Sequence, residues 1–189
     1  EIEWYHAIHP GLLLSLRQQG REAVPLNITL TEEKRILIIS GPNAGGKSVC
    51  LKTVAVVQYM MQCGMLPTLY YNSHMGVFRS IFIDIGDEQS FENDLSTYSS
   101  HLRNMRFFLR NADRRSLILA DEMGSGTEPQ IGGAMAQAIL SQLGKSGCMG
   151  LVTTHYQNLK TFAESTSGFV NGAMLYDRQH LQPTFQLSI

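Results

Sequence analysis

The strongest constraint on the fold is a glycine-rich segment, Gly41-Pro-Asn-Ala-Gly-Gly-Lys-Ser48, which separates two segments of different character. Residues 35–40 before it form a short apolar run rich in β-branched side chains, which is typical of a strand buried on both faces. After it, apolar side chains recur at helical spacing from Val49 to Met61. A strand, a glycine-rich turn and a helix N-terminus in this order predict an α/β fold with a phosphate-binding loop at the turn.

The segment fits the pattern G-x-x-x-x-G-K-[ST] at each fixed position. We expect the loop amides and the positive end of the helix dipole to bind the β- and γ-phosphates of a nucleotide. Lys47 would neutralise phosphate charge, and the Ser48 hydroxyl would be a ligand of Mg²⁺. The alternative is a glycine-rich turn that binds no ligand. The predicted nucleotide-binding residues are Gly41, Pro42, Asn43, Ala44, Gly45, Gly46, Lys47, Ser48 and Val49.

A second apolar run, residues 116–120, ends in the adjacent carboxylates Asp121 and Glu122. We expect this strand to neighbour the strand that precedes the phosphate loop, so that both carboxylates border the loop. Asp121 would hold Mg²⁺ through water, and Glu122 would act as the general base that activates the attacking water. The alternative is an acidic strand end that only caps the following turn.

A third apolar run, residues 149–153, leads to His155. A histidine at this strand end can donate a hydrogen bond to the terminal phosphate of a nucleotide. The predicted catalytic residues are therefore Lys47, Glu122 and His155, and the predicted metal ligands are Ser48 and Asp121.

The pattern of the whole chain predicts strands alternating with helices. With 189 residues and 43% hydrophobic composition, the chain has material for one core, so we expect a single domain spanning residues 1–189. The alternation implies a largely parallel sheet covered on both faces. Strands are predicted at 2–5, 27–30, 36–40, 81–85, 117–120 and 149–153, helices at 47–63, 97–112, 130–143 and 157–164, and an antiparallel pair at 169–177 and 181–187.

The composition of the chain limits the cellular compartments and the kinds of partner that we expect for it. No apolar run approaches the ~18 residues of a membrane span, and no signal-peptide pattern is seen, so we expect a soluble cytoplasmic protein without a membrane partner. The three cysteines lack C-x-x-C spacing and are expected to be buried thiols. A net charge of −1 argues against a domain that holds nucleic acid by its overall charge.

Four stretches occur in a characteristic order: GPNAGGKS, LSTYSSHL, LADEMGSGTEP and TTHY. Together they resemble the ATPase domain of MutS proteins, which belongs to the ABC-type P-loop ATPases. The segments DIGDEQS at 84–90 and DEMGSGTEP at 121–129 resemble the second bacterial type of MutS, the endonuclease MutS2-like proteins. The resemblance covers nearly the whole chain. It implies Mg²⁺-dependent ATP hydrolysis that works as a conformational switch in a DNA-binding protein of repair or recombination control.

The resemblance also implies partners. Two MutS ATPase domains pair head to tail, so a homodimer is expected in which Ser96 reaches the partner's nucleotide from the N-terminus of a helix. Asn43 would position the terminal phosphate or the water, and Gln89 would couple the metal site to other domains. Ser125 departs from the mismatch-recognising type, which commonly has arginine there. DNA would be contacted through domains outside this sequence. Because this sequence begins and ends in strand-like segments, we expect it to be a piece of a longer protein.

Several alternatives remain open from the residues alone. The alternatives are a nucleotide-binding module that is inactive in isolation, a small-molecule kinase, an ABC transporter ATPase and a ribosome-associated ATPase. Apolar candidates for the surroundings of an adenine are Trp4, Tyr5, Val24 and Met174, each with a plain core role as the alternative. Three arginines on one side of a predicted helix, Arg103, Arg106 and Arg110, either face DNA or a partner or form a solvated helix face.

Overall fold

The structure is a computed structural model that describes residues 1–42, 45–86, 94–177 and 179–189. Its centre is a six-stranded sheet with the strand order β5-β6-β7-β3-β8-β9. The first five strands of this order are parallel, and β9 pairs antiparallel with β8. The strands are β3 (Lys34–Ser40), β5 (Ser80–Asp84), β6 (Ser116–Ala120), β7 (Met149–Thr153), β8 (Gly168–Asp177) and β9 (Gln182–Ser188).

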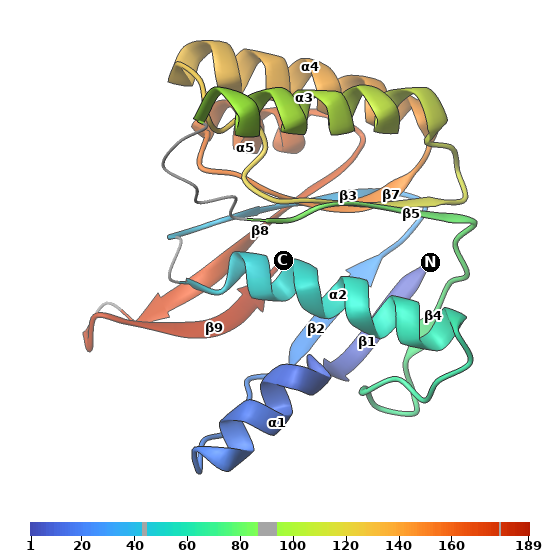
Figure 1. Ribbon diagram of the computed structural model, residues 1–189, viewed down its shortest axis with the longest axis vertical. Helices are drawn as coiled ribbons and strands as arrows, with labels where there is room; N and C mark the ends of the chain where they lie inside the picture. The colour runs from blue at the N-terminus through green and yellow to red at the C-terminus, as the bar shows by residue number, and fades with distance from the viewer. Residues whose placement is uncertain (43–44, 87–93, 178) are drawn as a thin grey trace.

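Helices cover both faces of this sheet (Figure 1). Helix α2 (Lys47–Gln62) lies on one face, where Leu51, Val54 and Val57 join a buried cluster with strands β3, β6 and β7. Helices α3 (Asp94–Asn111), α4 (Pro129–Ser146) and α5 (Gln157–Ser165) lie on the other face and build a second buried cluster. Because β6 and β7 are buried at every residue, they read as unbroken apolar runs and not as alternating ones.

A second, smaller sheet packs on the α2 side of the molecule. It has the order β2-β1-β4 and consists of β1 (Ile2–Ala7), β2 (Leu26–Leu30) and β4 (His74–Met75). The fully buried Trp4 of β1 joins the same cluster as α2. Helix α1 (Pro10–Gln18) connects β1 to β2 and begins at the His9 side chain, which accepts a hydrogen bond from the Leu12 amide at 3.3 Å.

The predicted α/β architecture with a mostly parallel sheet is confirmed. Strand β7 has the predicted bounds, and the predicted antiparallel tail forms β8 and β9. Helix α1 and the two-residue strand β4 were not predicted. Helix α1 has nine residues, which is shorter than the window over which helical periodicity is recognised, and none of its residues is buried. Among the described residues, no helix has the length and apolarity required to cross a membrane.

Helix α3 begins at Asp94, so Ser96 lies within its first turn. The helix turns Phe108 toward the sheet, where it is buried, while Leu109 is 38% exposed. One expectation about individual residues is wrong. Cys63 is exposed since it directly follows the last turn of α2, whereas Cys50 and Cys148 are buried as expected.

Candidate active site

The glycine-rich loop joins β3 to α2 in a conformation that needs glycine. Gly41 has φ 131° and Gly46 has φ 91°, both in the region that L side chains rarely adopt. A Cβ on Gly45 would lie 3.1 Å from the Cβ of Met174, so β8 also approaches the loop closely. Gly46 is the N-cap of α2 and has no side chain to bond the first amides of the helix. The helix N-terminus is therefore available to a phosphate. The predicted binding residues Asn43 and Ala44 lie outside the described residues.

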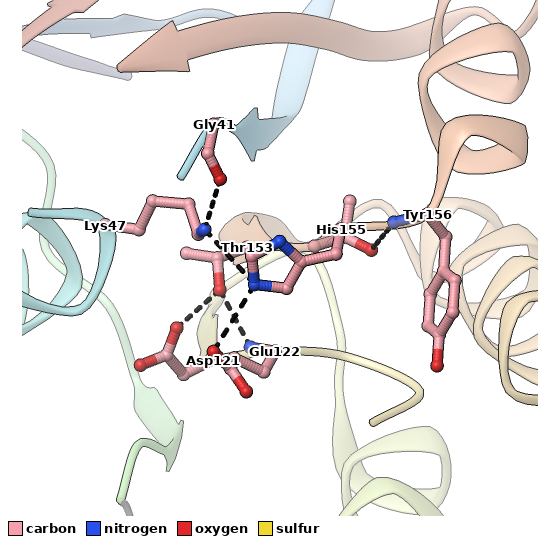
Figure 2. Close-up of polar contacts among 8 residues, drawn as sticks. Gly41, Lys47, Asp121, Glu122, Thr153, His155 and Tyr156 are labelled. Atoms are coloured by element: carbon pink, nitrogen blue, oxygen red, sulfur yellow. Dashed lines mark hydrogen bonds and ion pairs between the residues drawn. The ribbon is translucent and has the colours of Figure 1, made fainter. Parts of the chain in front are cut away.

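Lys47 is the first residue of α2, and its side chain is folded back under the loop. Only 1% of the residue is exposed. Its Nζ donates a hydrogen bond of 2.5 Å to the carbonyl oxygen of Gly41 and lies 3.4 Å from Nε2 of His155 (Figure 2). Burial lowers the pKa of the Lys47 ammonium group, while the nearby charges of Glu122 and Asp121 act in the opposite direction. The ammonium group of Lys47 therefore lies close to the carboxylates of Glu122 and Asp121.

The two predicted acidic residues lie at the end of β6, as the sequence indicates. Their strand, however, does not neighbour β3: strand β7 lies between them. At the end of β7, the Thr153 hydroxyl accepts a hydrogen bond from the Glu122 amide at 2.7 Å and donates one to Oδ1 of Asp121 (Figure 2). Strand β7, which lies between β3 and β6, therefore supplies the side chain that holds Asp121 and Glu122.

His155 completes this connection. Its Nε2 lies 3.5 Å from Oε1 of Glu122 as well as 3.4 Å from Nζ of Lys47. The His155 side chain is 44% exposed and that of Glu122 is 35% exposed, so both reach the surface beside the buried lysine. Glu122 itself has φ 45°, an unusual value for a residue with a side chain. The structure thus brings together Lys47, Asp121, Glu122 and His155.

The loop after Glu122 is held in place by a close approach of two glycines. A Cβ on Gly124, whose φ is 89°, would lie 2.6 Å from the carbonyl oxygen of Gly132 in α4 and 2.8 Å from Cε2 of Tyr156. The Tyr156 hydroxyl donates a hydrogen bond of 2.8 Å to the carbonyl oxygen of Gly124. This packing fixes the turn that presents the Glu122 side chain. Sequence reasoning did not identify Tyr156.

Asp84 is another residue that sequence reasoning missed. It ends β5, is 7% exposed, and its carboxylate lies 2.7 Å from Nδ1 of His101 and accepts a hydrogen bond of 2.8 Å from the Asn104 amide. Its carbonyl oxygen accepts a hydrogen bond of 2.8 Å from the Asp121 amide. Asp84 therefore connects α3 with the acidic strand end. The side chain of Ser96, predicted to act from α3, lies outside the described part, as does Gln89.

A cavity of about 280 Å³ opens beside the loop, between α1 and the β8–β9 hairpin. Among its lining residues are Gly46 of the loop, Val49 of α2, Val24, Met174 of β8 and Phe185 of β9. A Cβ on Gly46 would lie 3.1 Å from Cδ1 of Phe185, which places the aromatic ring directly against the loop. Of the four apolar candidates for a base site, Val24 and Met174 line this cavity. Trp4 is core and Tyr5 lies outside the lining.

Comparison with known proteins shows the family of the chain. The family model described as MutS domain V matches residues 37–189. Proteins named endonuclease MutS2 are 46% identical to the chain in Thermomicrobium roseum over 187 residues and in Levilactobacillus brevis over 169 residues. These alignments cover 96% and 89% of the chain but only 24% and 22% of the relatives. The chain spans about a quarter of the length of these relatives, and it belongs to the MutS domain V family as a MutS2-like member.

Proposed function

We propose that this chain is an ABC-type P-loop ATPase domain that binds Mg²⁺ and ATP and hydrolyses the terminal phosphate. The observation that carries the proposal is the convergence of four side chains from three strand ends. Lys47 follows β3, Asp121 and Glu122 follow β6, and His155 follows β7, with Nε2 of His155 within 3.5 Å of both Lys47 and Glu122. Such a cluster beside uncapped helix amides suits a triphosphate better than any other common ligand.

The phosphates would lie over the loop, where the first amides of α2 and the Lys47 ammonium provide positive charge. The base would enter the cavity lined by Val24, Met174 and Phe185, which has an apolar wall and directly adjoins Gly46. A largely apolar cavity beside a phosphate site is the usual arrangement of a nucleotide pocket. Both halves of an ATP molecule thus find a chemically matching surface.

The oxygen donors suit a magnesium ion. Ser48, the second residue of α2, and Asp121 offer a hydroxyl and a carboxylate, and Mg²⁺ prefers such ligands together with phosphate oxygens and water. Within the described residues, no group of three or more histidine, cysteine or acidic side chains forms a ready metal cage. This suits a metal that arrives with its nucleotide. When bound, Mg²⁺ would neutralise charge that develops on the phosphates.

The protein residues then divide the chemistry. Glu122 accepts a proton from the attacking water, a role that its half-exposed carboxylate can perform from the end of β6. Thr153 holds the backbone of Glu122 and the carboxylate of Asp121 in one orientation. His155, placed between the base and Lys47, contacts the terminal phosphate and the base together.

Hydrolysis would work as a conformational switch in the full-length protein. A homodimer would place Ser96 of α3 against the partner's nucleotide, and DNA would be handled by domains beyond this chain. The relatives are named endonuclease MutS2, which supports a role in repair or recombination control. The compartment that we propose for this role is the cytoplasm. The alternatives are a nucleotide-binding module that needs its partner for turnover and a ribosome-associated ATPase.

Two variants of the chain test the proposal. We expect calorimetry to show that Lys47→Ala loses binding of magnesium nucleotide while Glu122→Gln retains it. In a phosphate-release assay, Glu122→Gln is expected to turn over ATP at least about 100-fold more slowly than the parent, which is the usual contribution of a positioned general base. Equal turnover by Glu122→Gln and the parent would remove Glu122 as the base. A parent chain that is folded but gives no heat with magnesium nucleotide would end the proposal.

Protein concentration separates the switch from the inactive module. If the complete site needs a second chain, the turnover rate per chain rises with concentration, because association is governed by mass action. A rate per chain that stays flat over a hundredfold range of concentration shows that one chain is catalytically complete.

A further inference from the structure

Helix α3 presents a stripe of arginines and one phenylalanine to solvent. Arg103, Arg106, Phe107 and Arg110 follow one another at intervals of three, one and three residues, which places them on one side of the helix. All four are exposed, Phe107 by 56%, whereas Met105 and Phe108 on the opposite side are buried against the sheet. We name the surface formed by these four residues the arginine stripe.

Three further arginines lie at the turn that follows the helix: Arg114 and Arg115 belong to the turn, and Arg79 lies beside it. The Arg79 amide donates a hydrogen bond of 2.8 Å to the carbonyl oxygen of Arg115, and both side chains are exposed. The charges of Arg79 and Arg115 contribute to lowering the pKa of Asp113 at this turn, after its hydrogen bonds to the Arg115 amide and the Ser116 hydroxyl. The positive charge of the arginine stripe therefore continues past the end of α3.

This positive surface has little acidic compensation. No aspartate or glutamate occurs from residue 95 to 112, and among the described residues no arginine lies within 4.0 Å of a carboxylate. The stripe and the turn hold six of the 15 basic residues and one of the 16 acidic residues of the chain. The rest of the chain has nine basic and fifteen acidic residues, so the net charge of −1 is the sum of a positive surface and a negative remainder. A solvated helix face normally mixes both signs.

The chemistry of the stripe fits a chain of phosphates with accessible bases. Guanidinium groups bind phosphate in a bidentate manner. Arg103 and Arg110 are separated by seven residues, or about 10 Å along the helix, which is about three nucleotides at the ~3.4 Å rise of a stacked strand. The Phe107 ring packs edge-on against Phe82, with centroids 5.9 Å apart and planes at 75°, so the exposed ring has a supported orientation. An exposed, oriented ring between arginines is suited to stack on an unpaired base.

We infer that the arginine stripe of α3 binds single-stranded nucleic acid. An acidic polypeptide would satisfy the arginines but would not use the ring of Phe107. A duplex would offer phosphates but keep its bases stacked inside. The single strand is the partner that uses both components, and its binding does not depend on the nucleotide site.

The test measures binding of the 189-residue chain to a labelled 20-nucleotide thymidine strand by fluorescence anisotropy over a series of salt concentrations. Saturating magnesium nucleotide is present, so that the oligonucleotide cannot occupy the phosphate loop. We expect the triple variant Arg103→Gln, Arg106→Gln, Arg110→Gln to bind at least about tenfold more weakly at low salt. The slope of log K against log salt should fall by about 2, which corresponds to three lost phosphate contacts on a single strand.

A matched control removes the same charge elsewhere. The triple variant Arg17→Gln, Lys34→Gln, Lys145→Gln replaces three exposed basic residues on other elements and should bind like the parent. Phe107→Ala is expected to weaken binding about tenfold without changing the salt slope, while Phe107→Tyr, which keeps a ring, binds normally. Thermal unfolding of each variant verifies that it is folded.

Three results would overturn the inference. The first is equal loss of binding in the stripe and control variants, which would mean that only net charge matters. The second is binding of the strand only when magnesium nucleotide is left out, which would assign its binding to the phosphate loop. The third is displacement by polyglutamate as effective as by unlabelled thymidine strand at equal charge, which would point to an acidic protein partner.

Discussion

The hydroxyl of Thr153 donates a hydrogen bond to the carboxylate of Asp121, and this contact joins the ends of two neighbouring strands. The same hydroxyl accepts a hydrogen bond from the Glu122 amide at 2.7 Å. Thr153 is fully buried, so neither bond competes with water. One side chain therefore determines where the proposed metal ligand and the proposed base are held.

Replacing Thr153 with valine removes both bonds at nearly constant volume. We expect Thr153→Val to lower the free energy of unfolding by about 1–3 kcal/mol, because it leaves a buried amide unpaired. The turnover number for ATP should fall more than the affinity for nucleotide, since the loop and Lys47 are untouched. Urea unfolding and steady-state kinetics measure the two effects. Thr153→Ser keeps the hydroxyl and is the control; if it lost as much turnover as the valine variant, the hydroxyl would not be the cause.

Lys47 makes stability depend on pH in the alkaline range. Its pKa is lowered in the folded protein, so the unfolded chain binds more protons between that value and the ordinary pKa. The cost of holding the buried charge is therefore present at neutral pH and disappears as pH rises through this range. Without nucleotide, we expect Lys47→Met to be more stable than the parent at pH 8 and the difference to shrink toward pH 10.5. A difference in unfolding free energy that grows with pH would contradict this.

Gly124 tests how tightly the turn after Glu122 is packed. Gly124→Ala places a methyl group 2.6 Å from a backbone oxygen at φ 89°, and we expect a loss of about 3 kcal/mol together with a large loss of turnover. Gly20→Ala is the matched control, because Gly20 also has positive φ, 67°, but nothing lies within 4 Å of its Cβ position. Its loss should be about 1 kcal/mol. If thermal and urea unfolding gave equal losses of stability for Gly124→Ala and Gly20→Ala, the close approach of Gly124 to Gly132 would not be the cause of the loss.

Phe185 tests the assignment of the cavity to the base. We expect Phe185→Ala to raise the KM for ATP about tenfold, which corresponds to about 1.4 kcal/mol, with little change in the turnover number. Inhibition by tripolyphosphate, which lacks a base, should be unchanged, whereas Phe185→Tyr should resemble the parent. A parallel loss of tripolyphosphate affinity would show that Phe185 supports the phosphate loop instead of the base.

The sequence predicts much of this site because each of its parts follows an apolar run. The spacing from Gly41 to Ser48 and the polar residues after residues 120 and 153 identify Lys47, Asp121, Glu122 and His155 without coordinates. The order of the strands is not visible in this way. Residues 116–120 and 149–153 are equally apolar, so their sequences do not say which of them lies next to β3.

Other features depend on contacts between distant residues. Asp84 becomes a connector only because His101 and Asn104 of α3 pack over it, and Tyr156 matters only because Gly124 and Gly132 allow a close approach. The charge asymmetry on α3 is equally hidden in the net charge. Thr153 had a detectable signal: a hydroxyl at the end of a fully apolar strand has to find a partner.

The position of β7 has a consequence for the order of folding. This strand is made after β3 and β6 but is inserted between them, at residues 149–153. A growing chain that has not yet emerged past this point cannot hold Lys47 and Glu122 at their final separation, however well its earlier helices are formed. The proposed binding of nucleotide would therefore stabilise only states in which β7 is already in place, and not the earlier ones.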